Sequence, residues 1–263
     1  MRAVCPLRRG VGQLLRLYRA WRLRDGILSY LSFFRPYGWD RRTGWLQLDG
    51  NRFATRGADW VAVDEVALRG EYEFIRPLLA GPRPVVVDIG ANIGMFSLFA
   101  FHVNPEASVD AFEPSADTFG LLDGNRQSNP SLSWRCHNAA VHAQDGVVRF
   151  DNGPASTARR VTTGAGDPVP CLSLRTVVER VEAPVTLLKI DVEGSEEAIL
   201  VGNEDVLRRV DHVVIELHPS ACHTDRVIET LTRAFRYVHR VPGRESGKPL
   251  LLATRARIDL PYA

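Results

Sequence analysis

The chain has little lysine and little net charge. Lys189 and Lys248 are the only lysines among its 33 basic residues, and the formal net charge is +2. A protein whose ligand is nucleic acid usually carries a basic face, which this charge balance does not provide. We therefore expect no nucleic-acid partner. We interpret the preference for arginine as the mark of a GC-rich genome rather than of a function.

Cysteine motifs and long apolar segments are missing as well. The four cysteines form no Cys-x-x-Cys pair, so we expect neither a zinc site nor a disulfide framework, and a reducing cytoplasm fits. No apolar run reaches the roughly 18 residues of a membrane span, and residues 1–10 lack the apolar core of a signal peptide. The sequence predicts a cytoplasmic protein without stable membrane insertion.

The composition that remains is that of an ordinary globular protein. Hydrophobic residues make up 45% of the 263 and charged residues 24%, which suffices for one α/β domain and a modest extension. We divide the chain into an N-terminal extension, residues 1–80, and a core domain, residues 81–263. In the core domain, strand patterns alternate with helix patterns. This predicts a doubly wound, mostly parallel sheet that binds ligands at the carboxyl ends of its strands.

The most informative stretch begins with Val85-Val86-Val87-Asp88-Ile89, the pattern of a buried parallel strand. A helical pattern starts at Met95. Between them, the glycine turn Gly90-Ala91-Asn92-Ile93-Gly94 lets the backbone approach a ligand, and the first N–H groups of the helix point at it. An ordinary βα turn without a ligand is the alternative. The candidate cofactor residues here are Asp88, Gly90, Asn92 and Gly94.

An acid ends the next predicted strand, which runs from Ser108 to Glu113. Glu113 lies 23 positions after Gly90, and an acid about twenty residues past a glycine turn can accept both ribose hydroxyls of an adenosine. Helix capping is the alternative role for this carboxylate. The turn reads Gly-x-x-x-Gly, not the Gly-x-Gly-x-x-Gly that packs on a pyrophosphate. We therefore predict S-adenosylmethionine (SAM), and not NAD, as the cofactor.

Small residues end the third predicted strand of the core, residues 132–141. Its last part is Asn138-Ala139-Ala140-Val141, on which an adenine ring could lie flat. Close packing of the strand is the alternative. Asn138 and Ala140 are therefore also candidate cofactor residues.

A second polar group follows two later strands. Asp191 ends the apolar strand 187–190, and Glu216 and His218 end the strand that starts at Val213. Glu216 and His218 are two residues apart and so face the same side. If the two strands are neighbours, all three side chains come within reach of one another. We take Asp191, Glu216 and His218 as candidate catalytic residues.

Transfer of a methyl group to a hydroxyl requires a destination for the hydroxyl's proton. We predict His218 as the general base, oriented by Glu216 or Asp191, a role worth roughly 10²–10⁴-fold in rate. A divalent cation held by these three side chains is an alternative that we do not favour. Glu216 as a buried structural acid is another.

The N-terminal extension is predicted to cover the substrate site. Residues 11–34 have the pattern of an amphipathic, arginine-rich helix. Two short strands around an Asp-Gly-Asn turn are expected over 45–56, and a helix over 65–72. Four side chains could line a pocket, with core or surface roles equally open: Arg56, Trp60, Asp64 and Tyr72.

Four segments carry a family resemblance: Val87-Asp88-Ile89-Gly90-Ala91-Asn92-Ile93-Gly94, Phe112-Glu113-Pro114, Lys189-Ile190-Asp191-Val192-Glu193-Gly194-Ser195-Glu196 and Ile215-Glu216-Leu217-His218. With this set the chain resembles the FkbM family of SAM-dependent methyltransferases over about residues 60–255. The combination of the glycine turn with the Asp-Val-Glu-Gly-Ser-Glu segment is its most specific part.

The resemblance implies a class I methyltransferase, with a Rossmann-like, mostly parallel seven-stranded sheet whose last strand is antiparallel. It also implies O-methylation of a hydroxyl on a small molecule, such as a sugar or a secondary metabolite. By motif position, Gly90 and Asn92 would hold the amino-acid part of SAM and Glu113 the ribose. Ala140 would lie by the adenine, and Asp191 beside the methyl group.

Other classes of protein fit parts of the pattern. A NAD-dependent oxidoreductase would use the glycine turn and Glu113, but the third glycine is missing. A methyltransferase acting on nucleic-acid amino groups should show a basic face and an Asn/Asp-Pro-Pro-aromatic loop, and the sequence has neither. A non-catalytic SAM-binding protein would keep Gly90 and Glu113 without needing a base, and the sequence leaves it open together with the oligomeric state.

Overall fold

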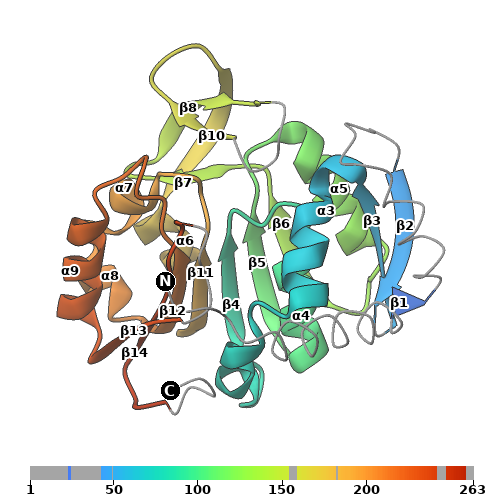
Figure 1. Ribbon diagram of the computed structural model, residues 1–263, viewed down its shortest axis with the longest axis horizontal. Coiled ribbons are helices and arrows are strands. Elements are labelled where there is room, and N and C mark those ends of the chain that lie inside the picture. The colour runs from blue at the N-terminus through green and yellow to red at the C-terminus, as the bar shows by residue number, and fades with distance from the viewer. Residues whose placement is uncertain are drawn as a thin grey trace, which may run out of the picture.

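The computed structural model describes residues 23–24, 43–48, 50–153, 159–181, 183–241 and 247–258. Figure 1 shows a central sheet with helices on both faces and a smaller sheet beyond one end of its strands. The predicted α/β class is confirmed. None of the helices within the described ranges is long and apolar enough to cross a membrane.

The central sheet has seven strands in the order β13-β14-β12-β11-β4-β5-β6. In that order they are β13 (Tyr237–Arg240), β14 (Leu250–Thr254), β12 (Val210–Glu216), β11 (Val185–Ile190), β4 (Val85–Ile89), β5 (Ser108–Phe112) and β6 (Ser133–His137). Strands β12, β11, β4, β5 and β6 run parallel to one another, whereas β14 pairs antiparallel with both β12 and β13. The mostly parallel sheet and its antiparallel last strand are as predicted.

Successive side chains of the central strands point to opposite faces. Val86 and Leu187 join one hydrophobic cluster with side chains of α4 (Met95–Val103) and α5 (Ala116–Gln127). Val87 and Leu188 join a second cluster on the other face. The helices of that face are α6 (Leu174–Arg180), α7 (Glu196–Leu200), α8 (Glu204–Leu207) and α9 (Thr224–Ala234). Burial on both faces explains why these strands are continuously apolar.

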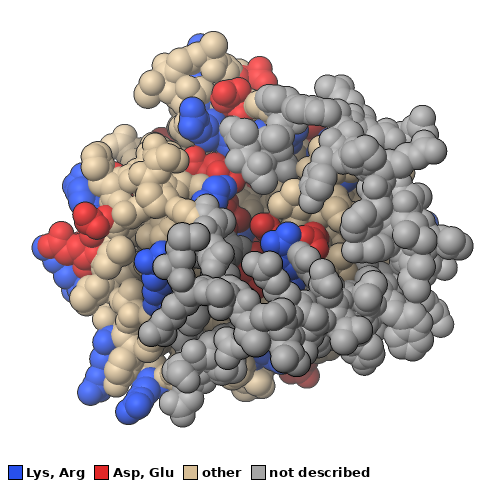
Figure 2. Space-filling model, viewed as in Figure 1, with Lys and Arg blue, Asp and Glu red and all other residues tan. Residues whose placement is uncertain are grey.

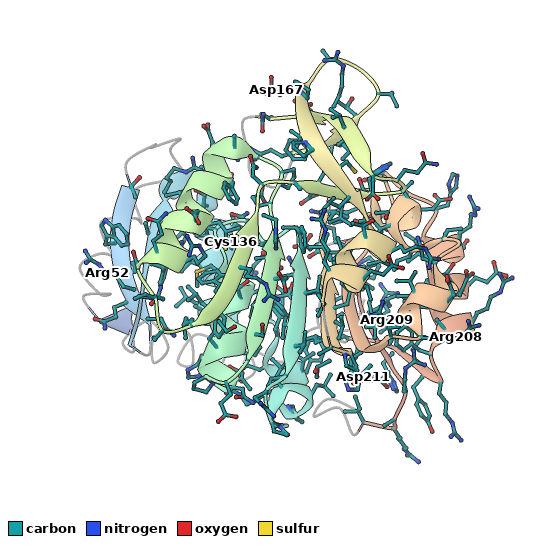
Figure 3. All side chains as sticks on the ribbon, turned by 180° about the vertical axis from the view of Figure 1, so that it is seen from behind. Arg52, Cys136, Asp167, Arg208, Arg209 and Asp211 are labelled. Carbon is teal, nitrogen blue, oxygen red and sulfur yellow. The ribbon has the colours of Figure 1, made fainter. Side chains whose placement is uncertain are left out.

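The smaller sheet has the order β7-β10-β8-β9. Its strands are β7 (Ala140–His142), β10 (Asp167–Ser173), β8 (Gly146–Asp151) and β9 (Arg160–Thr162). Asp167, labelled in Figure 3, lies where this sheet projects from the molecule. The single strand predicted over 132–141 is thus two strands, β6 and β7. The chain leaves the central sheet at Asn138, whose side-chain amide donates to the main-chain oxygens of Glu113 and Pro114.

The N-terminal part begins with the antiparallel sheet β1 (Leu23–Arg24), β2 (Thr43–Leu48) and β3 (Asn51–Arg56), which contains the predicted hairpin. Short helical segments follow, namely η1 (Gly57–Asp59), α3 (Trp60–Val63), the π-helical η2 (Asp64–Arg69) and η3 (Glu73–Leu79). The helix therefore starts earlier than predicted. It ends at Gly70, whose φ of +66° suits a left-handed helix end. The helix predicted over 11–34 lies outside the described residues, apart from Leu23–Arg24, which form a strand.

Residues on both sides of position 80 share one hydrophobic cluster. Phe53, Leu68 and Phe74 are buried with Val86 and Phe101. The described part of the extension thus packs directly on the sheet. The functional division at residue 80 stays a prediction.

Candidate active site

A cavity of about 950 Å³ opens at the carboxyl ends of β4, β5, β11 and β12. Strands β4 and β11 are neighbours at the point where the strand order reverses, since β5 and β6 continue to one side and β12 to the other. Such a switch point is where doubly wound sheets bind ligands. The smaller sheet and residues 61–72 of the extension also line the cavity. Figure 2 shows acidic and basic side chains gathered in the hollow at the centre of this face.

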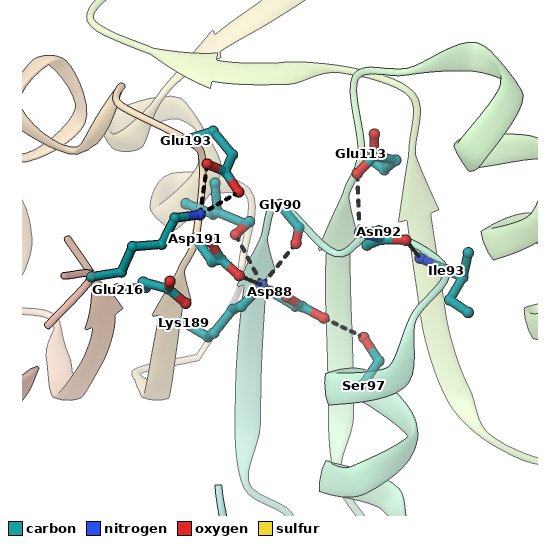
Figure 4. Close-up of polar contacts among 12 residues, drawn as sticks. Asp88, Gly90, Asn92, Ile93, Ser97, Glu113, Lys189, Asp191, Glu193 and Glu216 are labelled. Atoms are coloured by element: carbon teal, nitrogen blue, oxygen red, sulfur yellow. Dashed lines mark hydrogen bonds and ion pairs between the residues drawn. The ribbon is translucent and has the colours of Figure 1, made fainter. Parts of the chain in front are cut away.

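The cavity has two ends, which Figure 4 shows side by side. We call the part around Gly90, Asn92, Glu113 and Ala140 the Glu113 end. The part formed by Lys189, Asp191, Glu193, Glu216 and Lys248 is called the Asp191 end. All of these residues line the cavity. The two ends hold their polar groups in different ways.

Gly90 connects the two ends. Its φ is +77°, and a Cβ atom at this position would lie 1.8 Å from the carbonyl oxygen of Asp191. The close pairing of β4 with β11 therefore requires glycine here. The N–H groups of Gly90 and Ala91 both donate to the carbonyl of Phe112 at 3.0 Å, and that of Asn92 donates to Glu113.

At the Glu113 end, two main-chain N–H groups hold the side chain of Glu113 in place. Its Oε2 accepts from the N–H of Asn92 at 3.0 Å, and its Oε1 accepts from the N–H of Ser115 at 2.9 Å. Burial raises the pKa of Glu113 to about 7, although these two N–H groups act in the opposite direction. The bond to the N–H of Ser115, the N-cap residue of α5, fits the capping alternative, and the ligand role of this carboxylate stays a prediction.

The surface expected to lie by the adenine is apolar. Ala139, Ala140 and Val141 line the cavity together with Phe112. Asn138 does not line it, because its side chain binds main-chain oxygens beneath the wall.

Two further candidate cofactor residues, Asp88 and Gly94, lie behind the cavity wall and do not line it. Asp88 is fully buried, and its Oδ2 accepts from the Ser97 hydroxyl at 2.8 Å. Gly94 has a φ of +89°, and a Cβ there would lie 2.5 Å from the Trp134 ring. Of the predicted cofactor residues, those that line the cavity are Gly90, Asn92, Glu113, Ala140 and Asp191.

Lys189 neutralises part of the Asp191 end. Its Nζ donates to the carbonyl of Gly90 at 2.7 Å and lies 3.2 Å from Asp88 and 3.9 Å from Asp191. Burial disfavours the charge, but the two carboxylates raise the pKa of Lys189 above its ordinary value. The ammonium therefore remains charged in the sheet.

His218 lies behind the cavity wall and not in it. The ring is 3% exposed, with Nδ1 at 2.5 Å from Glu196 and Nε2 at 3.0 Å from Glu193. Burial lowers the pKa of His218, but the hydrogen bonds to both glutamates outweigh this and raise it to about 10. The imidazole therefore carries its proton at neutral pH and cannot accept another. This geometry argues against the base role predicted for His218.

Asp191, Glu216 and His218 do come together as expected, with Glu216 Oε1 at 4.0 Å from His218 Nε2. Burial, and then the nearby Asp191 carboxylate, raise the pKa of Glu216 to about 8. Burial also raises the pKa of Asp191, against the effect of Lys189. Both carboxyl groups line the cavity, which leaves them better placed than His218 to exchange a proton with a ligand.

The side chains that could hold a cation differ in one carboxylate from the predicted set, with Glu193 in place of Glu216. In the described part of the chain, Asp191, Glu193 and His218 each have one ligand atom within 4.8 Å of the others. Glu193, however, also accepts two contacts from the Lys248 ammonium, at 2.9 and 3.0 Å. No comparison tests the cation, and it stays an alternative.

Sequence reasoning did not find Lys189, Glu196 and Lys248 as site residues. One signal was available: the chain's only two lysines both reach the Asp191 end. A lysine inside an apolar strand needs a buried partner, so Lys189 could have been recognised. The pairing of Glu196 with His218 joins segments 22 residues apart and has no local signature.

The extension supplies one wall of the cavity. Tyr72, which was predicted as a possible lining residue, does line it, and its ring packs edge-on against Phe96. The other three candidates do not line it. Arg56 pairs with Asp59, Asp64 pairs with Arg69, and Trp60 packs against the hydrophobic core.

The fold is that of the class I methyltransferases. It is defined by the strand order, the antiparallel β14, the glycine turn after β4 and the acid after β5. The Methyltransferase FkbM domain matches residues 88–238, more than half of the chain, and the chain belongs to this family. Membership implies the use of SAM. The resemblance found in the sequence is confirmed.

Two curated relatives are each 33% identical to this chain. Hexuronic acid methyltransferase AglP of Haloferax volcanii matches over 57% of this chain and 64% of its own length. The 31-O-demethyl-FK506 methyltransferase FkbM of Streptomyces tacrolimicus matches over 52% of this chain and 66% of its own length. The chain thus spans a little under two thirds of each relative.

Solved structures with a partial likeness include a putative rRNA-methylase from Clostridium thermocellum. It has a TM-score of 0.47 and 9% identity over 70% of this chain and 93% of its own. A structure of WbdD has a TM-score of 0.45 and 13% identity over 72% of this chain and 39% of its own.

Proposed function

We propose that this protein transfers a methyl group from SAM to a hydroxyl oxygen of a small molecule, such as a sugar or a secondary metabolite. The observation that carries the proposal is the Glu113 carboxylate, held by two main-chain N–H groups in the wall of the cavity. The names of the two relatives, one acting on a hexuronic acid and one on 31-O-demethyl-FK506, support this substrate class.

The residues at the Glu113 end fit SAM. Glu113 would accept the ribose hydroxyls, and the apolar surface at Ala140 would take the adenine. Gly90 and Asn92 would lie against the amino-acid part, and Asp191 near the methyl group. SAM supplies an electrophilic methyl group on a sulfonium, so the chain must orient the acceptor oxygen and exclude water.

The proton of the acceptor hydroxyl would pass to Glu216. Its carboxyl lines the cavity, and its pKa of about 8 lies near working pH, where a general base is most effective. Asp191, whose side chain is 30% exposed, would lie beside the methyl group that is transferred. The His218 imidazolium would hold Glu193 and Glu196 in place, and residues 61–72 would form the cover over the acceptor.

An assay with isotope-labelled SAM and a panel of hexuronic acids, other sugars and macrocyclic alcohols tests the proposal. We expect label on an acceptor oxygen and release of S-adenosylhomocysteine. Glu216→Gln should keep SAM binding and lose turnover. Binding of SAM without transfer to any acceptor in the panel would favour a non-catalytic SAM-binding protein, and label on an acceptor nitrogen or carbon would contradict O-methylation.

A further inference from the structure

Asn125 of α5 and Asn129, two residues beyond the end of α5, pair with the outer edge of β3 in the way a neighbouring strand would. Asn125 Oδ1 accepts from the Ala54 N–H at 2.6 Å, and its Nδ2 donates to the Ala54 carbonyl at 3.1 Å. Asn129 repeats this with Arg52, at 3.0 and 2.7 Å. One helical turn separates the two side chains, and two residues separate their partners on β3. Arg52, labelled in Figure 3, marks the hairpin beside α5.

The second N–H of each amide has a different partner. Asn129 donates it to the carbonyl of Asn125, in the last turn of α5, at 2.7 Å. Asn125 donates it to the carbonyl of Ile93, in the glycine turn, at 2.8 Å. Asn125 is fully buried. A single amide therefore joins the N-terminal hairpin to the turn that carries Asn92.

The glycine turn needs contacts from outside residues 90–94 to hold its conformation. Asn92 has a φ of +52° without being glycine, and Gly94 has a φ of +89°. Such conformations persist when surrounding contacts hold them. The Asn92 N–H in turn orients Glu113, so the position of the Ile93 carbonyl bears on the carboxylate at the Glu113 end.

We propose that Asn125 is a positioning residue, which sets the glycine turn and Glu113 for SAM according to how the N-terminal hairpin is docked. The part that concerns SAM rests on the proposed function. Removal of the Asn125 amide leaves the Ile93 carbonyl and both main-chain groups of Ala54 buried without this partner. Removal of the Asn129 amide disturbs only the hairpin and the helix. Docking of the hairpin and binding of SAM should therefore be coupled through one residue.

The test compares Asn125→Ala with Asn129→Ala, which loses equivalent bonds to the same hairpin. Asn125→Ala should weaken SAM affinity about tenfold and accelerate amide hydrogen exchange at residues 92–94 as well as in β3. Asn129→Ala should accelerate exchange in β3 alone and leave SAM affinity within about threefold of wild type. Thermal unfolding of both variants shows whether their losses of stability are similar.

Equal effects of the two variants on SAM affinity and on exchange at residues 92–94 would overturn the proposal. If the alanine variants do not fold, the pair Asn125→Asp and Asn129→Asp keeps the acceptor oxygen, removes the donors and should give the same contrast. Hydrogen exchange reads the link between hairpin and turn without SAM. A wild type that does not bind SAM would contradict the proposed function, while the exchange contrast still decides the structural link.

Discussion

The two ends of the cavity hold their carboxylates by different means. At the Glu113 end, main-chain N–H groups of Asn92 and Ser115 fix one acid. At the Asp191 end, side chains from β11, β12 and the loops beyond them fix several acids through Lys189, Lys248 and His218. Main-chain donors depend on local backbone geometry, whereas the ion pairs depend on every partner being present. A substitution at the Glu113 end should therefore disturb few other groups, whereas one at the Asp191 end should disturb several ion pairs.

The largest effect is expected at the residue where the two ends meet. Gly90→Ala would place a Cβ atom 1.8 Å from the Asp191 carbonyl oxygen at a φ of +77°. We expect a loss of more than about 4 kcal/mol in the free energy of unfolding, from backbone strain and separation of β4 from β11. Urea unfolding measures it.

The matched control is Gly120→Ala, an exposed helical position with nothing within 4 Å of an added Cβ. It should stabilise the protein by about 0.5–1 kcal/mol. Equal stability of Gly90→Ala and wild type would show that β4 and β11 separate easily.

The next effect concerns the ion pairs of the Asp191 end. His218→Ala leaves Glu193 and Glu196 without their buried cation and should cost about 3–5 kcal/mol of unfolding free energy. His223→Ala removes an exposed histidine from Glu197 and should change stability little. Similar losses in both variants would contradict the view that His218 is the structural centre of this end.

The stabilising effect of His218 should also depend on pH. The folded pKa of His218, about 10, lies above its ordinary value of 6.5. Its stabilising contribution is therefore complete below pH 6.5 and is lost as pH rises towards 10. Unfolding experiments between pH 6 and 10 should show this decline in wild type and a smaller one in His218→Ala.

Turnover separates Glu216 from His218 as the base. Glu216→Gln should slow methyl transfer by roughly 10²-fold, the lower end for loss of a general base, while Glu197→Gln, outside the cavity, should not. Because the pKa of Glu216 is about 8, the wild-type rate should rise with pH up to that value and then level off. A rate that keeps rising to pH 10 and disappears in His218→Ala, with folding intact, would restore His218 as the base.

The smallest effect is the pH dependence of SAM binding. The ionised form of Glu113 accepts hydroxyl hydrogens best, and its pKa is about 7. Affinity for SAM should therefore rise severalfold between pH 6 and pH 8. Calorimetry on Glu113→Gln, which cannot ionise, should give weaker binding with little change over this range.

The contrast between the two ends also explains what the sequence could predict. The strand, turn and helix around Gly90 are encoded by consecutive residues, and Glu113 follows at a typical spacing, so the sheet and the place of Gly90 and Glu113 at its carboxyl edge could be predicted from the sequence. Asp191 and Glu216 were found because they end apolar strands. The clamp on His218 could not be found, because Glu193 and Glu196 acquire their partner only when α7 and the segment after β12 pack together.

The account depends above all on Glu113 holding SAM. Calorimetric titration at pH 8 of wild type and Glu113→Ala with SAM, S-adenosylhomocysteine and NAD tests this directly. We predict that wild type binds both adenosyl compounds and not NAD, and that Glu113→Ala binds them about 10–100-fold more weakly because two ribose hydroxyls lose their acceptor. Unchanged SAM affinity in Glu113→Ala, or tight binding of NAD without SAM binding, would contradict the account.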